Sequence, residues 1–517
     1  MIFEHFDLQP GSPTIAQTRK DLLSAAKACK AFSVPALSSL WRILPSLLPL
    51  LLLLPSAEVS NNHYVSPRPL LYLFRRLIGS KFVDRLPLGS NWERFDLYAP
   101  RVRTLYMERL RVVISPHVYL RIRSLRRHRD APLLPGLKEI YIPNETSLDF
   151  SAALLLSSES SLNLVHLDNS AMSDRQFCIP FLFLLSVNSP NLTHLALCGT
   201  ADTALELVPC FKSLQSLELR LSGTDLNSRI LRDLGKLDNL LEMTLDTSPS
   251  IHAPTTPSDP TPPLTNFSFI QLRKLRILGT PSSMSRILNE MDGLTNLTTL
   301  IIHEKGHDTE GSWSHCFAII STFPAIEDIE ITQSWRYPYP LSTLCFYPLC
   351  KLNNMTSFVI NNFTLSGSDE DFRFLTCSFP KLKKFVEPCT RYGTEGKTLA
   401  CLFDFSQANQ NLQELKISLG YDISENLKAI SLYELGCPII QNHHHPLEKL
   451  YITSSNFESM DLPDMIQVAQ FLDLIFPNLS TLEAYGSYQN DVSNWTKIQQ
   501  IRVALQAARN FASQNHV

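Results

Sequence analysis

The chain lacks the short motifs on which most enzymes build an active site. Its 517 residues contain no Gly-x-Ser-x-Gly elbow, no Gly-x-Gly-x-x-Gly turn, no phosphate-binding loop and no His-Glu-x-x-His pair. We therefore expect a non-catalytic protein with no catalytic residue and no cofactor-binding residue. A hydrolase built on the edge of the fold is the catalytic alternative, and turnover of generic ester or phosphate substrates would reveal it.

Patterned metal ligands are also lacking. The eleven cysteines form no Cys-x-x-Cys pair, and the two nearest in sequence are Cys345 and Cys350. A zinc site or a disulfide framework has tighter spacing, so we interpret these residues as reduced thiols of an intracellular chain, cytoplasmic or nuclear. Residues 443–445 are three consecutive histidines, but consecutive residues on a loop rarely converge on one ion. The sequence therefore predicts no metal site.

Strong net charge and a membrane-length apolar run are absent as well. A formal net charge of −3 gives no electrostatic preference for nucleic acid or a membrane surface. The run Leu47–Leu54 is bounded by Pro45 and Pro55 and interrupted by Pro49, which leaves it well short of the about 20 apolar residues of a membrane helix. It predicts a buried helix rather than a membrane span. The first residues also lack the basic segment and apolar core of a secretory signal.

What the sequence does contain is a recurring Leu-x-x-Leu-x-Leu pattern, usually just after a pair such as Pro-Asn or Pro-Lys. It is clearest at residues 192–197, 214–219, 412–417 and 447–452, and it recurs every 22 to 35 residues. Because one repeat cannot bury its apolar face alone, such repeats stack into a solenoid with an extended binding surface. The first apolar residues of the repeats are Val102, Leu137, Leu162, Leu192, Leu214, Leu240, Leu272, Leu297, Ile326, Met355, Leu382, Leu412, Leu447 and Leu479.

Each repeat is expected to hold one short strand followed by a helix. The apolar positions of the pattern point into the core, and successive strands form a curved parallel sheet. The connecting segments carry apolar residues at helical spacing and predict helices on the outer face. The predicted fold class is therefore α/β, a solenoid over residues 131–490 followed by a helical tail over 491–517. Residues 248–264 are proline-rich and predict an extended loop, either an inert insertion or a docking segment.

Alternation along the strands nominates a binding face. Side chains that flank the core leucines point away from the core, and a mixture of charged and aromatic residues suits protein recognition. An ordinary solvated sheet face is the alternative. The candidate substrate-binding residues are Tyr141, His194, Glu218, Arg220, Glu242, Arg276, Glu330, Lys416, Tyr451 and Tyr485.

Residues 101–130 are rich in arginine. They carry nine arginines, opposed only by Glu108 and Asp130. An arginine cluster binds phosphate or an acidic peptide through bidentate hydrogen bonds, which would suit a phosphorylated substrate, and a solvated helical face is the alternative. Nucleic acid is not expected as a partner, because only Tyr106 and Tyr119 interleave with the arginines and no recognised motif accompanies them.

The N-terminal segment resembles an F-box. Residues 20–22 (Lys-Asp-Leu) match the central Asp-Leu of that motif, residues 28–32 are similar to its Val-Cys-Lys/Arg-x-Trp core, and residues 40–41 match its closing Leu-Trp. Together with the repeats, the chain resembles the leucine-rich repeat F-box proteins of fungal type. It departs from them in lacking the Leu-Pro-x-Glu opening, in having a longer loop over residues 7–18, and in placing Phe32 where Trp is usual.

The resemblance implies a substrate-recognition subunit of a Skp–cullin–F-box ubiquitin ligase, in which partner subunits perform the chemistry. Residues 1–60 would form the F-box-like unit and residues 61–130 a helical connector. The implied partners are a Skp-type adaptor, through it a cullin, and a protein substrate. The alternative is a leucine-rich interaction scaffold with no ligase role, whose N-terminal helices only cap the solenoid. The candidate adaptor contacts are Ile2, Phe3, Leu22, Leu23, Phe32, Leu40 and Trp41.

Overall fold

The computed structural model of the chain divides into two compact units. The first unit comprises Met1–Thr224 and Arg232–Leu240, and the second comprises Asp225–Leu231 and Leu241–Val517. The residues that the structure describes are 15–54, 59–60, 81–83, 92–107, 112–114, 122, 124, 132–143, 153, 156, 162–199, 204–221, 226, 228–246, 269–291, 293–306, 310–334, 340–387, 397–420, 445–453, 460–484 and 489–514.

Two helices form a hairpin in the first unit. Helix α1 (Ile15–Ala28) and helix α2 (Lys30–Arg42) are separated by Cys29, whose extended backbone (φ −157°, ψ 160°) ends α1. Leu22 and Ala36 are buried between them. A proline inside a helix removes a hydrogen bond and would be predicted to end or restart it, but Pro35 lies inside α2. The interruption falls at Cys29 instead, because a residue with extended φ and ψ cannot continue the helical hydrogen bonds.

The run of leucines forms a short buried helix, as predicted. Helix α3 (Leu48–Leu51) buries Leu50 and Leu51, and the adjacent Leu47 and Leu54 are buried as well. Pro49 lies in the first turn, where the missing N–H of a proline removes no helical hydrogen bond. Among the helices within the described ranges, none combines the length and the apolar character that crossing a bilayer requires.

The main sheet of the first unit is parallel, with the strand order β1-β4-β6-β7-β8-β9. Its register aligns one buried apolar side chain from each repeat, and these form a continuous row: Leu105, Ile140, Val165, Leu195 and Leu217. The strands are β1 (Ile43–Leu44), β4 (Thr104–Tyr106), β6 (Glu139–Ile142), β7 (Leu164–Leu167), β8 (His194–Gly199) and β9 (Ser216–Leu221).

Further elements surround this sheet. A small second sheet has the order β2-β3-β5, in which β3 pairs antiparallel with β2 and parallel with β5. Helix α9 (Ser228–Leu234) is divided between the residues of the two units. The other elements are β2 (Val59–Ser60), β3 (Lys81–Val83), β5 (Val112–Ile114), α4 (Glu93–Tyr98), η4 (Ala99–Arg101), α7 (Asn169–Ser173), α8 (Arg175–Asn188) and η5 (Ala204–Cys210).

The second unit continues the same plan of parallel strands and connecting helices. Its sheet has the order β10-β11-β12-β13-β15-β17-β18-β19-β20. The strands are β10 (Glu242–Asp246), β11 (Lys274–Gly279), β12 (Thr299–Glu304), β13 (Asp328–Gln333), β15 (Ser357–Asn361), β17 (Lys384–Val386), β18 (Glu414–Ser418), β19 (Lys449–Thr453) and β20 (Thr481–Ala484), with a separate parallel pair, β14 (Pro340–Ser342) and β16 (Thr364–Ser366).

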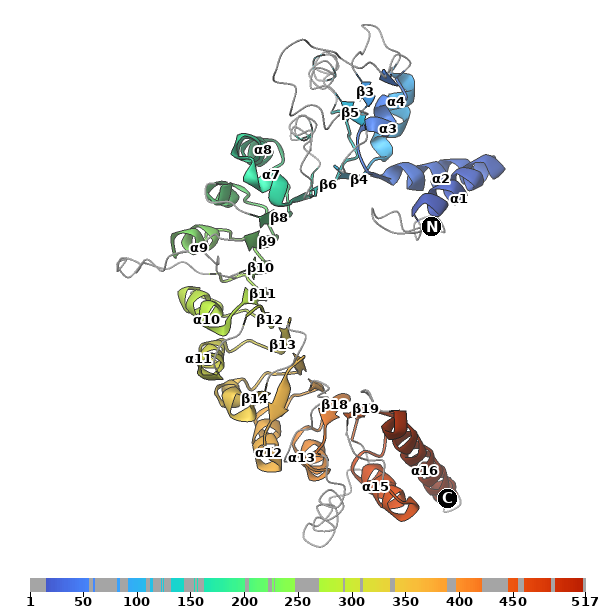
Figure 1. Cartoon of the computed structure of the whole chain (residues 1–517), viewed down its shortest axis with the longest axis vertical. Helices are drawn as coiled ribbons and strands as arrows, with labels where there is room; N and C mark the ends of the chain where they lie inside the picture. The colour runs from blue at the N-terminus through green and yellow to red at the C-terminus, as the bar shows by residue number, and fades with distance from the viewer. Residues whose placement is uncertain are drawn as a thin grey trace, which may run out of the picture. The chain divides into compact units, whose positions relative to one another are not determined.

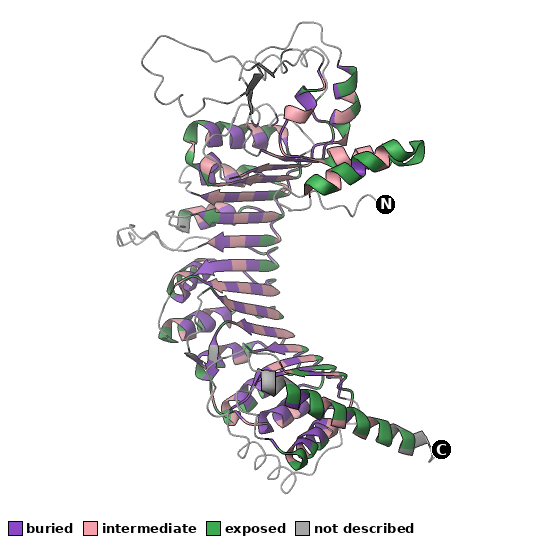
Figure 2. Cartoon of the chain, turned by 45° about the vertical axis from the view of Figure 1, so that its right-hand side comes forward, coloured by how far each residue is buried: buried purple, intermediate pink, exposed green. Residues whose placement is uncertain are grey.

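The helices of the second unit up to residue 408 lie together on one side of its sheet, whereas the C-terminal helix packs beside its last strand, β20 (Figure 1). Buried and partly exposed residues alternate along the strands and appear as stripes (Figure 2). The helical element around Cys345 is a 3₁₀ helix. The helical elements are α10 (Pro281–Glu290), α11 (Glu310–Ile320), η6 (Thr343–Lys351), α12 (Asp369–Ser378), α13 (Ala400–Ala408), α15 (Leu462–Ile475) and α16 (Gln489–Gln514).

The repeat pattern is confirmed strand by strand. Every repeat start predicted from Val102 to Leu479 is followed, two residues later, by the first residue of a strand of a main sheet. Strand β1 was not predicted, because its two residues are too short to show a period. The chain is therefore an α/β protein built from leucine-rich repeats with parallel strands and connecting helices.

Four asparagines that lie immediately before the first apolar residue of a repeat tie that repeat to the preceding one. Each donates its side-chain amide to a backbone carbonyl of the preceding repeat, which explains why Asn so often precedes the pattern. The bonds are Asn239 to the Lys212 carbonyl (2.9 Å), Asn296 to Ile270 (2.8 Å), Asn354 to Pro324 (3.2 Å) and Asn478 to His445 (3.1 Å).

Candidate binding face of the strands

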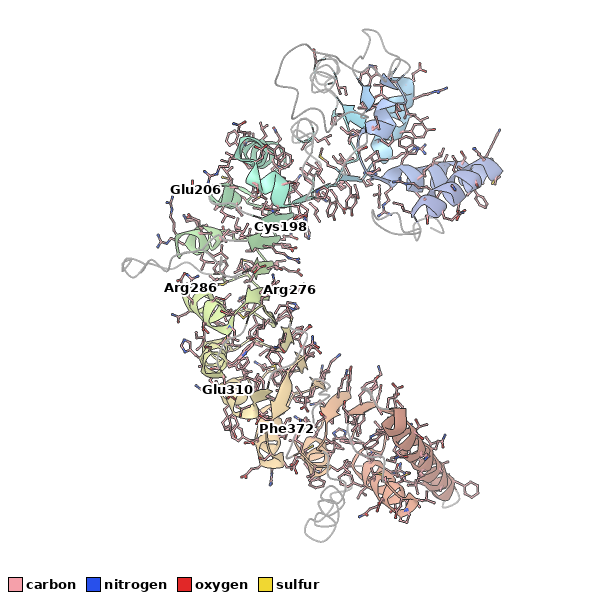
Figure 3. All side chains as sticks on the ribbon, viewed as in Figure 1. Cys198, Glu206, Arg276, Arg286, Glu310 and Phe372 are labelled. Carbon is pink, nitrogen blue, oxygen red and sulfur yellow. The ribbon has the colours of Figure 1, made fainter. Side chains whose placement is uncertain are left out.

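The parallel strands present an open face on the side away from their buried row. The predicted face residues alternate with buried ones as expected, and none of those that the structure describes is buried. Figure 3 shows Cys198 and Arg276 on the strand side of their units, whereas Glu206 and Arg286 lie on the helical side. His194, Arg220 and Glu242 are exposed, and those partly exposed are Tyr141, Glu218, Arg276, Glu330, Lys416 and Tyr451; Tyr485 lies outside the described residues.

An aromatic ladder runs across the face in the first unit. Tyr106, Tyr141 and His166 occupy matching positions on β4, β6 and β7. The rings of Tyr106 and Tyr141 stack with centroids 4.5 Å apart and planes at 7°, and His166 follows 5.9 Å from Tyr141 at 29°. Burial raises the pKa of Tyr141 to about 12, with Glu139 and Tyr106 adding to the effect. The phenol therefore stays neutral and offers a hydroxyl donor at physiological pH.

Beyond the ladder, the same face carries a cluster of three different metal-binding side chains. The ligand atoms of His166, Asp168 and Cys198 lie within 4.8 Å of one another. Cys198 is in register with Arg220, whose guanidinium lies 2.5 Å from the Glu218 carboxylate. Sequence reasoning missed this cluster, although the alternation rule, applied to the repeat that starts at Leu162, would have placed His166 on the face.

In the second unit, the first residues of the strands form the outermost row of the face, and this row carries charges of both signs. Neighbouring strands place opposite charges side by side, with Lys274 3.8 Å from Glu242 and Lys384 3.2 Å from Glu414. Lys305, which follows β12, also pairs with Asp246. Because these charges largely compensate one another, the row favours no single sign of partner charge.

The third residues of the strands form the next row of the face in the second unit, and this row is less polar than we expected. Arg276 lies in register with Ile301, and Glu330 lies between Ile301 and Val359. Ile301 and Val359 are both partly exposed, and sequence reasoning did not nominate them. Arg276 donates to Nε2 of His303 at 2.6 Å, so that imidazole is neutral with its proton on Nδ1. Charged groups flanking exposed aliphatic ones are the composition that protein interfaces use.

The helical hairpin divides its predicted adaptor contacts between core and surface. Leu22 is fully buried inside the hairpin, so its side chain is used for folding. Leu23 and Phe32, in contrast, are 42% and 47% exposed, and Val34, which sequence reasoning did not select, is 62% exposed. Three large apolar side chains near the turn between α1 and α2 therefore face solvent.

The remaining predicted adaptor contacts lie nearer the sheet. Leu40 packs against the hairpin core, and Trp41 is partly buried. The Trp41 ring stacks on Tyr98 with centroids 4.7 Å apart, so this tryptophan joins the hairpin to α4. Ile2 and Phe3 lie outside the described residues.

Two of the nine arginines in segment 101–130 fall within the described ranges, and both have partners inside the fold. The guanidinium carbon of Arg101 lies 5.4 Å from the centre of the Tyr98 ring. Arg103 donates to the carbonyl of Gly136 at 3.0 Å. These contacts give the two arginines a structural role. The other seven arginines of the segment lie outside the described residues.

His445 has a structural role. Its Nδ1 accepts the N–H of Leu447 at 3.2 Å, which places the proton on Nε2, 3.2 Å from the Asn409 carbonyl. Burial lowers the pKa of His445 to about 4, so it is a neutral histidine inside the second unit. His443 and His444 lie outside the described residues.

The comparisons with known sequences and with solved structures gave different results. No family model matches the chain, and no curated protein matches it. Among solved structures, a chain in the crystal structure of the yeast Rad7–Elc1 complex is similar at 15% sequence identity with a TM-score of 0.30, over 73% of this chain and 84% of that one. A likeness this weak carries no argument, so the fold assignment rests on the strands and their register, and the F-box resemblance stays a prediction.

Proposed function

We propose that the chain is a substrate-recognition subunit of a Skp–cullin–F-box ubiquitin ligase. In this proposal the α1–α2 hairpin binds a Skp-type adaptor, the adaptor brings the cullin, and the strand face binds the protein to be modified. The single observation that carries the proposal is the exposure of Leu23, Phe32 and Val34 on the hairpin. A hairpin that served only as a cap would keep its large apolar side chains against the repeats, whereas exposed apolar groups favour a docking surface.

The strand face supports the second half of the proposal. The face of the first unit carries a stacked aromatic ladder and that of the second carries rows of charged residues. Aromatic and arginine side chains are the common anchors of protein interfaces. The ladder in the first unit is held by ring stacking, so it requires little ordering when a partner binds. The strand face therefore suits a folded or extended protein segment as its ligand.

Binding of the purified full-length chain to a Skp-type adaptor tests the proposal. We expect a complex in pull-down and calorimetry that weakens on Leu23→Asp and Phe32→Asp, because each change places charge in an apolar contact and removes an anchor with a contribution of about 2 kcal/mol or more. Phe183→Asp is the matched control, since Phe183 is a 55% exposed apolar residue on α8 of the same unit.

Trp41 is a poorer test position, because its stacking on Tyr98 would confound loss of binding with loss of folding. If the folded chain binds no adaptor, or if the two hairpin variants bind as well as the unchanged protein, the ligase role is wrong. The leucine-rich interaction scaffold would then be the better description of the molecule.

A further inference from the structure

Two neighbouring strands bring three metal-binding side chains together on the strand face of the first unit. In the parallel register His166 of β7 lies opposite Ala196 of β8, so the position two residues further along places Asp168 beside Cys198. Residues two apart on a strand point to the same side. All three side chains are partly exposed, and their ligand atoms lie within 4.8 Å of one another.

The backbone holds this arrangement in place. The N–H of Asp168 donates to the Ile142 carbonyl at 2.9 Å, and its Oδ1 accepts the N–H of Asn169 at 3.2 Å, which fixes the carboxylate at the start of α7. Gly199 follows Cys198 with φ +134°, and a Cβ there would lie only 2.7 Å from Cα of Asn169. The close approach of the end of β8 to the Asp168–Asn169 turn therefore depends on glycine.

The side chains next to the cluster are small or already have partners. Ala196, opposite His166, adds only a methyl group between the strands, and the His166 ring is oriented by its stacking on Tyr141. The nearby cation, Arg220, is paired with Glu218 at 2.5 Å, so its charge is partly compensated.

The donor set selects the class of ion. A histidine nitrogen, a cysteine thiolate and a carboxylate oxygen are the three ligand types that zinc uses, and a thiolate disfavours calcium and magnesium. Three protein ligands with a fourth position left over is the arrangement of open zinc sites.

We propose that His166, Asp168 and Cys198 bind one zinc-type divalent cation on the strand face of the first unit, with a fourth coordination position open to solvent. Binding converts the Cys198 thiol to a thiolate and releases its proton to solvent, so affinity falls as pH falls. The open position lies on the face that we assign to protein recognition, but the metal site is independent of any ligase role.

Cobalt(II), added to the chelator-treated full-length chain, is the probe. We expect one equivalent to produce a thiolate-to-cobalt charge-transfer band, and an equimolar amount of zinc to remove it. Cys198→Ser should abolish that band. His166→Asn and Asp168→Asn should weaken cobalt binding by more than the roughly 10–100-fold that loss of an outer-shell partner causes. Asp168→Asn keeps an oxygen acceptor for the start of α7, so this variant preserves the cap.

Cys210→Ser is the matched control, because Cys210 is an exposed cysteine of the same unit outside the cluster. It should retain the band at full intensity. The proposal is wrong if the unchanged chain gives no thiolate band, or if the band survives in Cys198→Ser. Circular dichroism of each variant separates loss of a ligand from loss of the fold, and His166→Asn supplies an independent reading should Cys198→Ser not fold.

Discussion

The two units differ in where they keep their charged side chains. Among the residues that the structure describes, the first unit buries only small polar groups, namely Ser46, Thr104 and Ser189, and its charged side chains are all partly or fully exposed. The second unit has a charged face too, but it also encloses whole ionisable side chains. Those buried in the second unit include Glu304, Glu387, Lys397, Asp404, His445 and Arg502.

Enclosed charge needs internal partners, and the second unit supplies them. Lys397 donates to Glu387, and the other carboxylate oxygen of Glu387 accepts the N–H of Ser418 at 3.2 Å. Lys397 also lies 4.4 Å from the centre of the Phe372 ring. Burial nevertheless raises the pKa of Glu387 against the lowering effect of Lys397. The same repeat architecture therefore tolerates two kinds of interior. That of the first unit is nearly uncharged, and that of the second contains charged side chains that depend on specific partners.

Of the changes considered, Lys397→Met should lower the free energy of unfolding the most. The change leaves the Glu387 carboxylate buried without its cation, and breaking a buried pair from one side costs about 3–5 kcal/mol. Urea unfolding followed by circular dichroism would measure the loss. Lys384→Met is the control, because Lys384 pairs with Glu414 at the surface, where a pair contributes about 0.2–1 kcal/mol. Equal losses in the two variants would contradict the view that burial makes the pair important.

Acidification should weaken the second unit through His445. Its folded pKa of about 4 lies below the unfolded value near 6.5, so below pH 6.5 protons bind preferentially to the unfolded chain. The stabilisation is complete above pH 6.5 and is lost as pH falls towards 4, by roughly 2 kcal/mol at pH 5. His445→Gln can keep both hydrogen bonds without titrating. Unfolding at pH 7 and pH 5 should therefore show a smaller loss in the variant.

Asp404 supplies a control, because its protonation should change stability in the direction opposite to that of His445. Burial raises the pKa of its carboxyl to about 6, although Arg373 lies 3.7 Å away and acts in the lowering direction. The folded state therefore binds this proton more tightly than the unfolded chain, and stability rises as pH falls from 6 towards 4. Asp404→Asn should steepen the acid loss, whereas His445→Gln should flatten it. The same change of slope in both variants would show that one of the two assignments is wrong: the one for His445 if both variants steepen the loss, and the one for Asp404 if both flatten it.

The repeat pattern predicted most of the fold. Leucine spacing placed the start of each main-sheet strand from β4 to β20, because the three apolar positions must all reach the core. Alternation then placed Tyr141, Glu218 and Arg276 on the open face. Both inferences are local, since they need only the period of a strand and the requirement to bury leucine.

What the sequence could not supply depends on register and on long-range pairing. Cys198 lies 30 residues after Asp168, and only the alignment of β7 with β8 brings them together. Lys397 was not expected inside the protein, because lysine is almost never buried unless it is paired. Phe32 and Leu22 had equal standing as apolar hairpin residues until the packing of α1 on α2 buried one and exposed the other.

Tyr141→Ala should lower the free energy of unfolding by less than Lys397→Met does. It tests how the strand face of the first unit differs from that of the second. The change removes ring contacts to both Tyr106 and His166, and a stacked pair contributes about 0.5–1.5 kcal/mol beyond its buried area. We expect a loss of about 1–2 kcal/mol in unfolding free energy, while Tyr141→Phe, which keeps the ring, should stay near the unchanged protein. Lys274→Ala removes an exposed pair from the second unit's face and should change stability by less than about 0.5 kcal/mol. A larger loss from Lys274→Ala than from Tyr141→Ala would mean that cross-strand charge, not ring stacking, supports the strand face.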